Sequence, residues 1–141
     1  MYPFNVRVYG LLIESDSILI THETIKGFNM TKFPGGGLEF GEGTMDCLIR
    51  EFKEELNLDI TVKDHFYTTD IFQASAFNPS DQIISIYYLV ERNSLNSIEL
   101  TEEEIVRSIS WKNINSLESE RLSFPIDRLV LELLKKENLD S

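Results

Sequence analysis

Three carboxylates crowd into one short stretch of the sequence, REFKEEL at residues 50–56. On a helix, Glu51 stands three and four residues from Glu54 and Glu55, so each of these like-charge pairs costs roughly 0.2–0.5 kcal/mol. Their position in a last helical turn also opposes the helix dipole. Such a cluster is poor for stability, but carboxylate oxygens are the ligands that hard divalent cations prefer. The pattern therefore indicates either a solvated acidic face or a cation site.

The residues before the cluster follow a regular spacing. Gly36 is followed after five residues by Glu42, and after seven more by the segment Arg50–Leu58. This order resembles the signature of the Nudix hydrolases, G-x5-E-x7-R-E-U-x-E-E-x-G-U, in which U is an apolar residue. Every position matches except Asn57, where the signature has glycine. Asparagine is the next-best residue for a left-handed turn at a helix end, so all charged members stay in place.

The resemblance implies a role for the clustered residues. Glu51, Glu54 and Glu55 would be ligands of Mg²⁺ or Mn²⁺, joined by the backbone carbonyl of Gly36. Glu51 and Glu54 would also carry the catalysis, with Glu54 preferred as a ligand and Glu51 as the general base that accepts a proton from water. Hydrolysis of a phosphate compound suits such a site, because cations cancel the charge of the phosphate and activate water.

Residues around the cluster would support it. Glu42 and Arg50 would tie the loop to the helix, because a planar guanidinium can grip carboxylates and orient them. Lys32 precedes the glycine loop and is a candidate contact for a substrate phosphate; the alternative is an ordinary surface lysine. The run Glu102–Glu104 is a second candidate source of the general base, and the alternative there is an exposed charge run.

The same resemblance implies the substrate class. The family cleaves a phosphoanhydride bond in a nucleoside diphosphate linked to another moiety, by water attack on phosphorus. A nucleoside triphosphate, a nucleotide sugar and ADP-ribose all stay open, because residues 73–76, QASA, carry neither the proline nor the tyrosine that marks certain subgroups. The alternative function is a non-catalytic domain of the same fold that senses a nucleotide.

Composition and charge limit the class of protein further. The 141 residues are enough for one core, so we expect a single domain over residues 1–141. A net charge of -11 argues against DNA as a partner, and apolar runs of strand length argue against a membrane. One cysteine and an N-terminus unlike a signal peptide fit a cytoplasmic protein. The expected partner is a nucleotide-derived small molecule, and a homodimer stays open.

Periodicity and turn residues predict strands at residues 6–13, 18–23, 58–72 and 83–91, one more ending near residues 109–111, and helices at residues 44–56 and from residue 125. This order predicts an α/β domain, and the resemblance implies an α/β/α sandwich with a mixed sheet. Both helices and one tryptophan should contribute core residues: Met45, Leu48, Ile49, Phe52, Leu56, Trp111, Ile126, Leu129, Val130, Leu133 and Leu134. Some aromatic residues could stack on a base, although core positions are more typical of them: Phe28, Phe40, Tyr67, Phe72 and Phe77.

Overall fold

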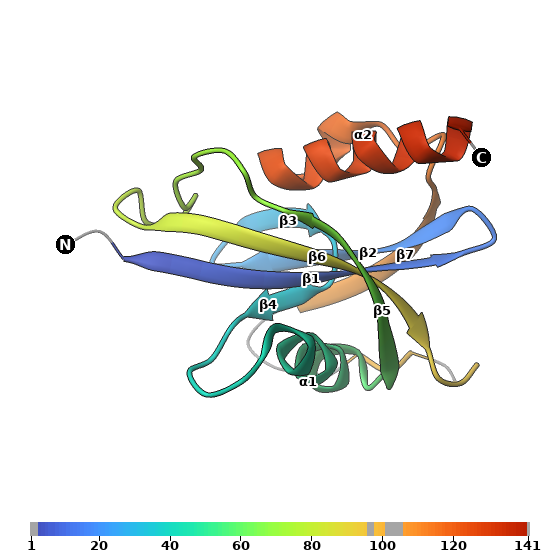
Figure 1. The fold of residues 1–141 in the computed structure, drawn as a ribbon, viewed down its shortest axis with the longest axis horizontal. Helices are drawn as coiled ribbons and strands as arrows, with labels where there is room; N and C mark the ends of the chain where they lie inside the picture. Colours follow the sequence, from blue (N-terminus) through green and yellow to red (C-terminus); the bar gives the residue numbers. More distant parts are fainter. Residues whose placement is uncertain (1–2, 96–97, 101–105, 141) are drawn as a thin grey trace.

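Two helices cover opposite faces of one sheet in the computed structural model, which describes residues 3–95, 98–100 and 106–140 (Figure 1). The strands are β1 (Phe4–Glu14), β2 (Ser17–Ile25), β3 (Phe28–Lys32), β4 (Gly35–Gly37), β5 (Ile60–Thr68), β6 (Gln82–Arg92) and β7 (Val106–Asn113). The helices are α1 (Thr44–Leu56), α2 (Pro125–Asp140) and a short 3-10 helix, η1 (Ser119–Arg121). Because β1 and β6 run parallel and the other pairs antiparallel, the predicted α/β/α sandwich with a mixed sheet is confirmed.

β1 is the strand on which the sheet is assembled. It pairs with β6 along most of its length and with the glycine strand β4 near its beginning, where Arg7 lies opposite Gly37. At its end it turns into β2 through Ser15 and Asp16, whose φ angles of 51° and 67° suit a tight two-residue hairpin. Side chains alternate between the two faces of β1, with Val8 and Leu12 toward α1 and Tyr9 toward α2.

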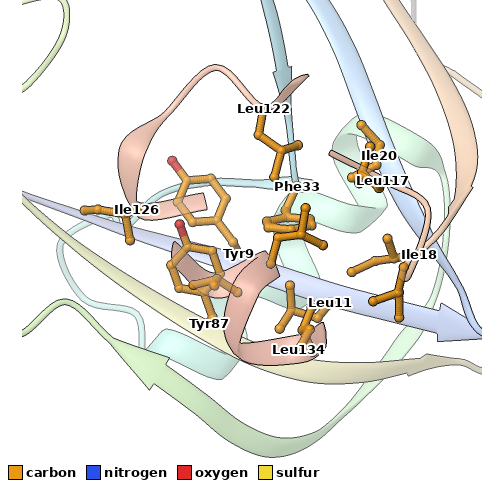
Figure 2. Close-up of a cluster of buried hydrophobic side chains, with 13 residues drawn as sticks. Tyr9, Leu11, Ile18, Ile20, Phe33, Tyr87, Leu117, Leu122, Ile126 and Leu134 are labelled. Carbon is orange, nitrogen blue, oxygen red and sulfur yellow. The ribbon is translucent and has the colours of Figure 1, made fainter. Parts of the chain in front are cut away.

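A separate hydrophobic cluster lies between the sheet and each helix. In the cluster beneath α2, the Tyr9 and Tyr87 rings lie with their centres 5.2 Å apart and their planes tilted by 32°, among Phe33 and aliphatic side chains (Figure 2). The cluster beneath α1 contains Val8, Leu12, Leu19, Cys47, Leu48, Phe52, Leu56, Leu58, Ile60, Tyr88 and Val90. In the described part of the chain, neither helix is long and apolar enough to cross a membrane.

The buried arc of α1 agrees only in part with the predicted one: Leu48, Phe52 and Leu56 are buried as predicted. Met45 and Ile49, expected in the core, are 48% and 41% exposed. The fully buried side chains are Cys47, Leu48, Phe52 and Leu56. At about 100° per residue, Glu51 and Glu55 fall inside the arc that these four residues define, and so does Met45, which belongs to the first turn of the helix. Ile49 lies just outside the arc. The helix therefore turns two of its carboxylates, together with its apolar residues, toward the sheet.

Other core predictions also need correction. Leu133 on α2 is 36% exposed, because the helix packs through Leu131 instead. Trp111 is 37% exposed and stacks on the Arg92 guanidinium, 5.5 Å from its ring centre, at the surface of the sheet. Five aromatic residues for which the sequence favoured a core position are exposed or half-buried, because they lie on connections, strand ends and hairpin tips. They are Phe28, Phe40, Tyr67, Phe72 and Phe77.

The end of α1 gives a testable consequence. Asn57 adopts the left-handed conformation, with φ 49° and ψ 41°, and its N–H donates to the Lys53 carbonyl at 3.1 Å. We expect Asn57→Gly to keep or raise the free energy of unfolding and Asn57→Val to lower it by about 1–2 kcal/mol, because a branched side chain disfavours this backbone. Urea unfolding measures both. Asn29→Val, at an exposed strand position, is the control, and equal stability of both Val variants would contradict a left-handed helix end.

Candidate active site

The glycine strand β4 lies directly against the carboxylate cluster of α1. A Cβ atom on Gly36 would stand 2.4 Å from the Glu51 Cδ atom and 2.6 Å from both of its carboxylate oxygens. No side chain fits in that space, so only glycine lets Glu51 lie against the backbone of β4. The sequence-predicted pair Gly36 and Glu51 is thus brought together by the close approach of α1 and β4.

Arg50 is the centre of the hydrogen bonds around the cluster. Its Nε and Nη2 atoms donate to the two carboxylate oxygens of Glu42 at 3.0 and 2.7 Å. Its Nη1 atom donates to Glu51 Oε1 at 2.9 Å and to Glu54 Oε2 at 3.1 Å. The hydrogen bonds from Arg50 and from the backbone of Glu39 lower the pKa of Glu42 to about 2. One guanidinium therefore holds three carboxylates from the loop and the helix.

Glu54 and Glu55 have opposite environments. The Glu54 side chain is 60% exposed, whereas that of Glu55 is 18% exposed and its Oε1 atom lies 3.4 Å from Nη2 of Arg107. Burial raises the pKa of Glu55, although Lys32 and Arg107 act in the opposite direction. Arg107, on β7, also pairs with Glu23 at 3.4 Å, so a buried ion network leads away from the cluster. Nothing in the predicted motif pointed to Arg107.

Lys32 belongs to the same network. Its ammonium group donates to Glu23 at 3.3 Å and to the Phe33 carbonyl at 3.2 Å, and it lies 5.5 Å from the centre of the Tyr9 ring. The side chain is 6% exposed, so the alternative of an ordinary surface lysine is wrong. Its contact with a substrate stays a prediction. The second candidate base, Glu102–Glu104, lies outside the described residues.

A pocket of about 250 Å³ opens between the sheet, the start of α2 and the connection from β5 to β6. Its polar lining includes Arg7, Lys32 and Asp127, and its apolar lining includes Met30 and Phe77. Residues 73–76, which lack the subgroup markers, form part of its wall. A mostly apolar pocket with a few polar groups is the usual form of a site for a small organic ligand.

Asp127 is a pocket residue that sequence reasoning missed. It is 1% exposed, its Oδ1 atom accepts a hydrogen bond from the Tyr87 hydroxyl, and its Oδ2 atom has no hydrogen-bond partner among the described residues. Burial raises the pKa of Asp127 to about 6, while the Tyr87 hydrogen bond and the nearby Lys32 act against this shift. The feature of the sequence that could have indicated Asp127 is its position as an acidic residue on the buried face of a helix, beside Ile126 and Val130.

The donor chemistry of the cluster fits a divalent cation. Glu51 brings a carboxylate to the backbone of Gly36, and Mg²⁺ and Mn²⁺ take carboxylate and carbonyl oxygens. Within the ranges that the structure describes, no three acidic, histidine or cysteine side chains meet as a formed metal site. Arg50 draws Glu51 and Glu54 to one side, and Arg107 draws Glu55 to another.

Comparison with known proteins identifies several similar chains. A family model described as the NUDIX domain matches residues 1–134. The mRNA-decapping protein OPG122 of Variola virus is 33% identical over 73 residues, and the match covers 50% of this chain but only 28% of that protein. The MutT NUDIX hydrolase from Burkholderia pseudomallei has a TM-score of 0.76 at 18% identity, covering 92% of this chain and 96% of its own. A NUDIX hydrolase from Nitrosomonas europaea has a TM-score of 0.76 at 20% identity, and the match covers 92% of this chain and 86% of that protein.

The Arg50 contacts predict a coupled loss of stability. Arg50→Lys keeps the charge but lacks the planar fork, so we expect the free energy of unfolding to fall by about 1–2 kcal/mol. Combined with Glu42→Gln, the loss should be smaller than the sum of the single losses by more than about 0.5 kcal/mol. Urea unfolding of the four proteins measures this coupling. Arg121→Lys, at an exposed arginine, should change little, and fully additive losses would argue against the pairing.

Asp127 predicts an unusual pH dependence. Because its folded pKa of about 6 lies above the ordinary value of 3.8, the folded protein loses stability as the pH rises through this window. Asp127→Asn cannot ionise, so its stability relative to the wild type should improve by about 2–3 kcal/mol between pH 4 and pH 7. Urea unfolding at four pH values tests this expectation. Asp64→Asn, at an exposed carboxylate, should not show the trend, and a parallel pH dependence of Asp127→Asn and the wild type would refute it.

Proposed function

The chain belongs to the NUDIX domain family, and we propose that it is a pyrophosphohydrolase, a metal-dependent hydrolase of nucleoside diphosphate derivatives. Water attacks phosphorus and the phosphoanhydride bond breaks. The observation that carries the proposal is the Glu51 carboxylate, packed on the backbone of Gly36 and oriented by Arg50. In this arrangement an acidic group lies in one fixed orientation beside a strand that has no side chains.

The proposed cofactor is Mg²⁺ or Mn²⁺, as in Nudix hydrolases generally. Glu51, Glu54, Glu55 and the Gly36 carbonyl would hold it, and when bound it supplies neutralisation of phosphate charge and acidification of water. Glu54 is well exposed, and among the described residues only Arg50 pairs with it, so its carboxylate can turn toward a ligand at small cost. Such a cation would also offset part of the net charge of -11 when an anionic substrate binds.

Glu51 is the proposed general base. Arg50 donates to its Oε1 atom, and in the described part of the chain its Oε2 atom receives no hydrogen bond. Oε2 is therefore the atom that accepts the proton when water attacks phosphorus. Arg50 and Glu42 contribute by position: their paired hydrogen bonds fix the direction in which the Glu51 carboxylate points.

The pocket supports a nucleotide-derived substrate. Its apolar walls suit the flat face of a base, and Arg7 and Lys32 bring two basic groups into a lining that also contains the acidic residues Glu23 and Asp127. The proposal includes three substrate classes: nucleoside triphosphates, nucleotide sugars and ADP-ribose. It also includes a cytoplasmic location, one domain over residues 1–141, and action on a small molecule rather than on DNA or a membrane, with a homodimer as an assembly to be tested.

Turnover of a nucleotide panel tests the proposal. Representatives of the three classes are incubated with Mg²⁺ or Mn²⁺, and kcat is compared for the wild type, Glu51→Gln and Glu54→Gln. Each substitution keeps the shape and removes a charge, so we expect kcat to fall by roughly 10²-fold or more while the fold persists. Glu120→Gln, at an exposed position, should leave kcat unchanged.

The position of attack has its own measurement. In ¹⁸O-labelled water, the label should appear on a phosphate-containing product and not on a sugar carbon or a base. Full activity in the presence of a chelator, or label on carbon, would overturn the mechanism. Absence of turnover with every member of the panel would overturn the proposed substrate classes.

A further inference from the structure

Arg7 lies where the pocket meets the glycine strand. It stands opposite Gly37 in the pairing of β1 with β4, and its Nη1 atom is 3.5 Å from the point where a Gly37 Cβ would be. The neighbouring Gly36 faces Glu51 in the same way. Because successive residues of a strand point to opposite faces, Arg7 and the Glu51 carboxylate lie on opposite faces of β4.

The Arg7 side chain is held in place but keeps hydrogen-bonding capacity. Its Nε atom donates to the Tyr9 hydroxyl at 2.8 Å, and its guanidinium lies 5.8 Å from the Tyr9 ring centre. Among the described residues, its two terminal nitrogens take part in no hydrogen bond or ion pair. A half-buried guanidinium with two unused donor groups is well suited to a phosphate, which accepts paired hydrogen bonds.

The two basic side chains of the pocket lining, Arg7 and Lys32, differ in how many of their hydrogen-bond donors are already used. Lys32 is committed to Glu23 and to the Phe33 carbonyl. No carboxylate of the described residues contacts Arg7, but the charges of Glu51 and Glu55 act on it across the strand. Burial disfavours its charge, yet Tyr9 and these carboxylates outweigh burial and raise the pKa of Arg7, so it stays fully charged.

We propose that Arg7 is a substrate-binding residue whose terminal nitrogens hold an oxygen of the phosphate adjoining the group in the pocket. The proposal rests on the proposed function and adds the orientation of the substrate to it. The phosphate next to the pocket-bound nucleoside meets Arg7, and the phosphate chain then continues past β4 toward the carboxylates. Arg7 therefore selects substrates in which a phosphate is attached directly to the group that fills the pocket.

Two measurements on Arg7 variants test this inference. Titration calorimetry with AMP, ADP, GDP and UDP, in the presence of a chelator, reports binding without any contribution from metal. For each nucleotide that the wild type binds, Arg7→Met should weaken affinity at least tenfold. Arg7→Lys keeps the charge but not the paired donors and should weaken it less. With the substrate of highest turnover in the panel, Arg7→Met should raise KM at least tenfold and lower kcat much less.

Three controls keep the result specific. Lys136→Met removes one exposed positive charge far from the pocket lining and should leave affinity and KM unchanged. Mn²⁺ binding to Arg7→Met, measured with the metal alone, should match the wild type because Arg7 is not a ligand. Thermal unfolding shows whether each variant is folded. If Arg7→Met is not folded, Arg7→Lys is used in its place for the affinity and KM measurements.

The outcomes separate this inference from the proposed function. If folded Arg7 variants keep the nucleotide affinity and the KM of the wild type, the role of Arg7 is overturned, and the proposed hydrolase function is unaffected. Weakened nucleotide affinity in a protein that hydrolyses nothing in the panel would support Arg7 and overturn the proposed function. Binding of none of the four nucleotides by the wild type would overturn the inference, because the pocket would then take no nucleoside phosphate.

Discussion

The packing of the Glu51 carboxylate on the backbone of β4 is the constraint on which the rest of the site depends. It requires glycine at position 36, where any Cβ would displace the carboxylate. It also requires α1 to turn a charged residue toward the sheet, which is unfavourable unless that charge is paired. Arg50 supplies the pairing and joins Glu51 to the loop through Glu42. The loop, the strand and the helix are therefore fixed by one charged contact.

The orientation of α1 follows from this contact. A helix placed only by its apolar residues would bury Ile49, but this residue is 41% exposed. The buried arc includes Glu51 and Glu55, and each has an arginine near it. Burial of two like charges in one helix is destabilising by itself, so Arg50 and Arg107 offset electrostatic repulsion in the fold. A cation bound at the same carboxylates would offset more of this repulsion.

Local patterns predicted the fold and the residues of the signature, whereas the features that were missed depend on contacts between distant parts of the chain. The spacing from Gly36 to Leu58 was sufficient to group Glu42, Arg50 and Glu51 as neighbours. Hydrophobic periodicity placed Leu48, Phe52 and Leu56 in the core correctly but missed the carboxylates beside them, because it treats every carboxylate as solvent-facing. Arg7 and Arg107 lie on strands remote from the signature, and only the pairing of β1 with β4 and of β2 with β7 brings them near it. The position of Asp127 on an apolar helix face was a sign in the sequence that its carboxylate is buried. Its hydrogen bond with Tyr87 could not be predicted from the sequence.

The three glycines of β4 make it a partition with no side chains, and this has a consequence for how such a protein can diversify. Residues of the pocket lie on the α2 face of the partition, and the carboxylates lie on the α1 face. Pocket residues outside the ion network of Lys32, Glu23, Arg107 and Glu55 can be substituted, and recognition reshaped, without changing a side chain that contacts the carboxylates. The two faces can therefore accumulate mutations at different rates. The ion network is the place where a change on one face would reach the other.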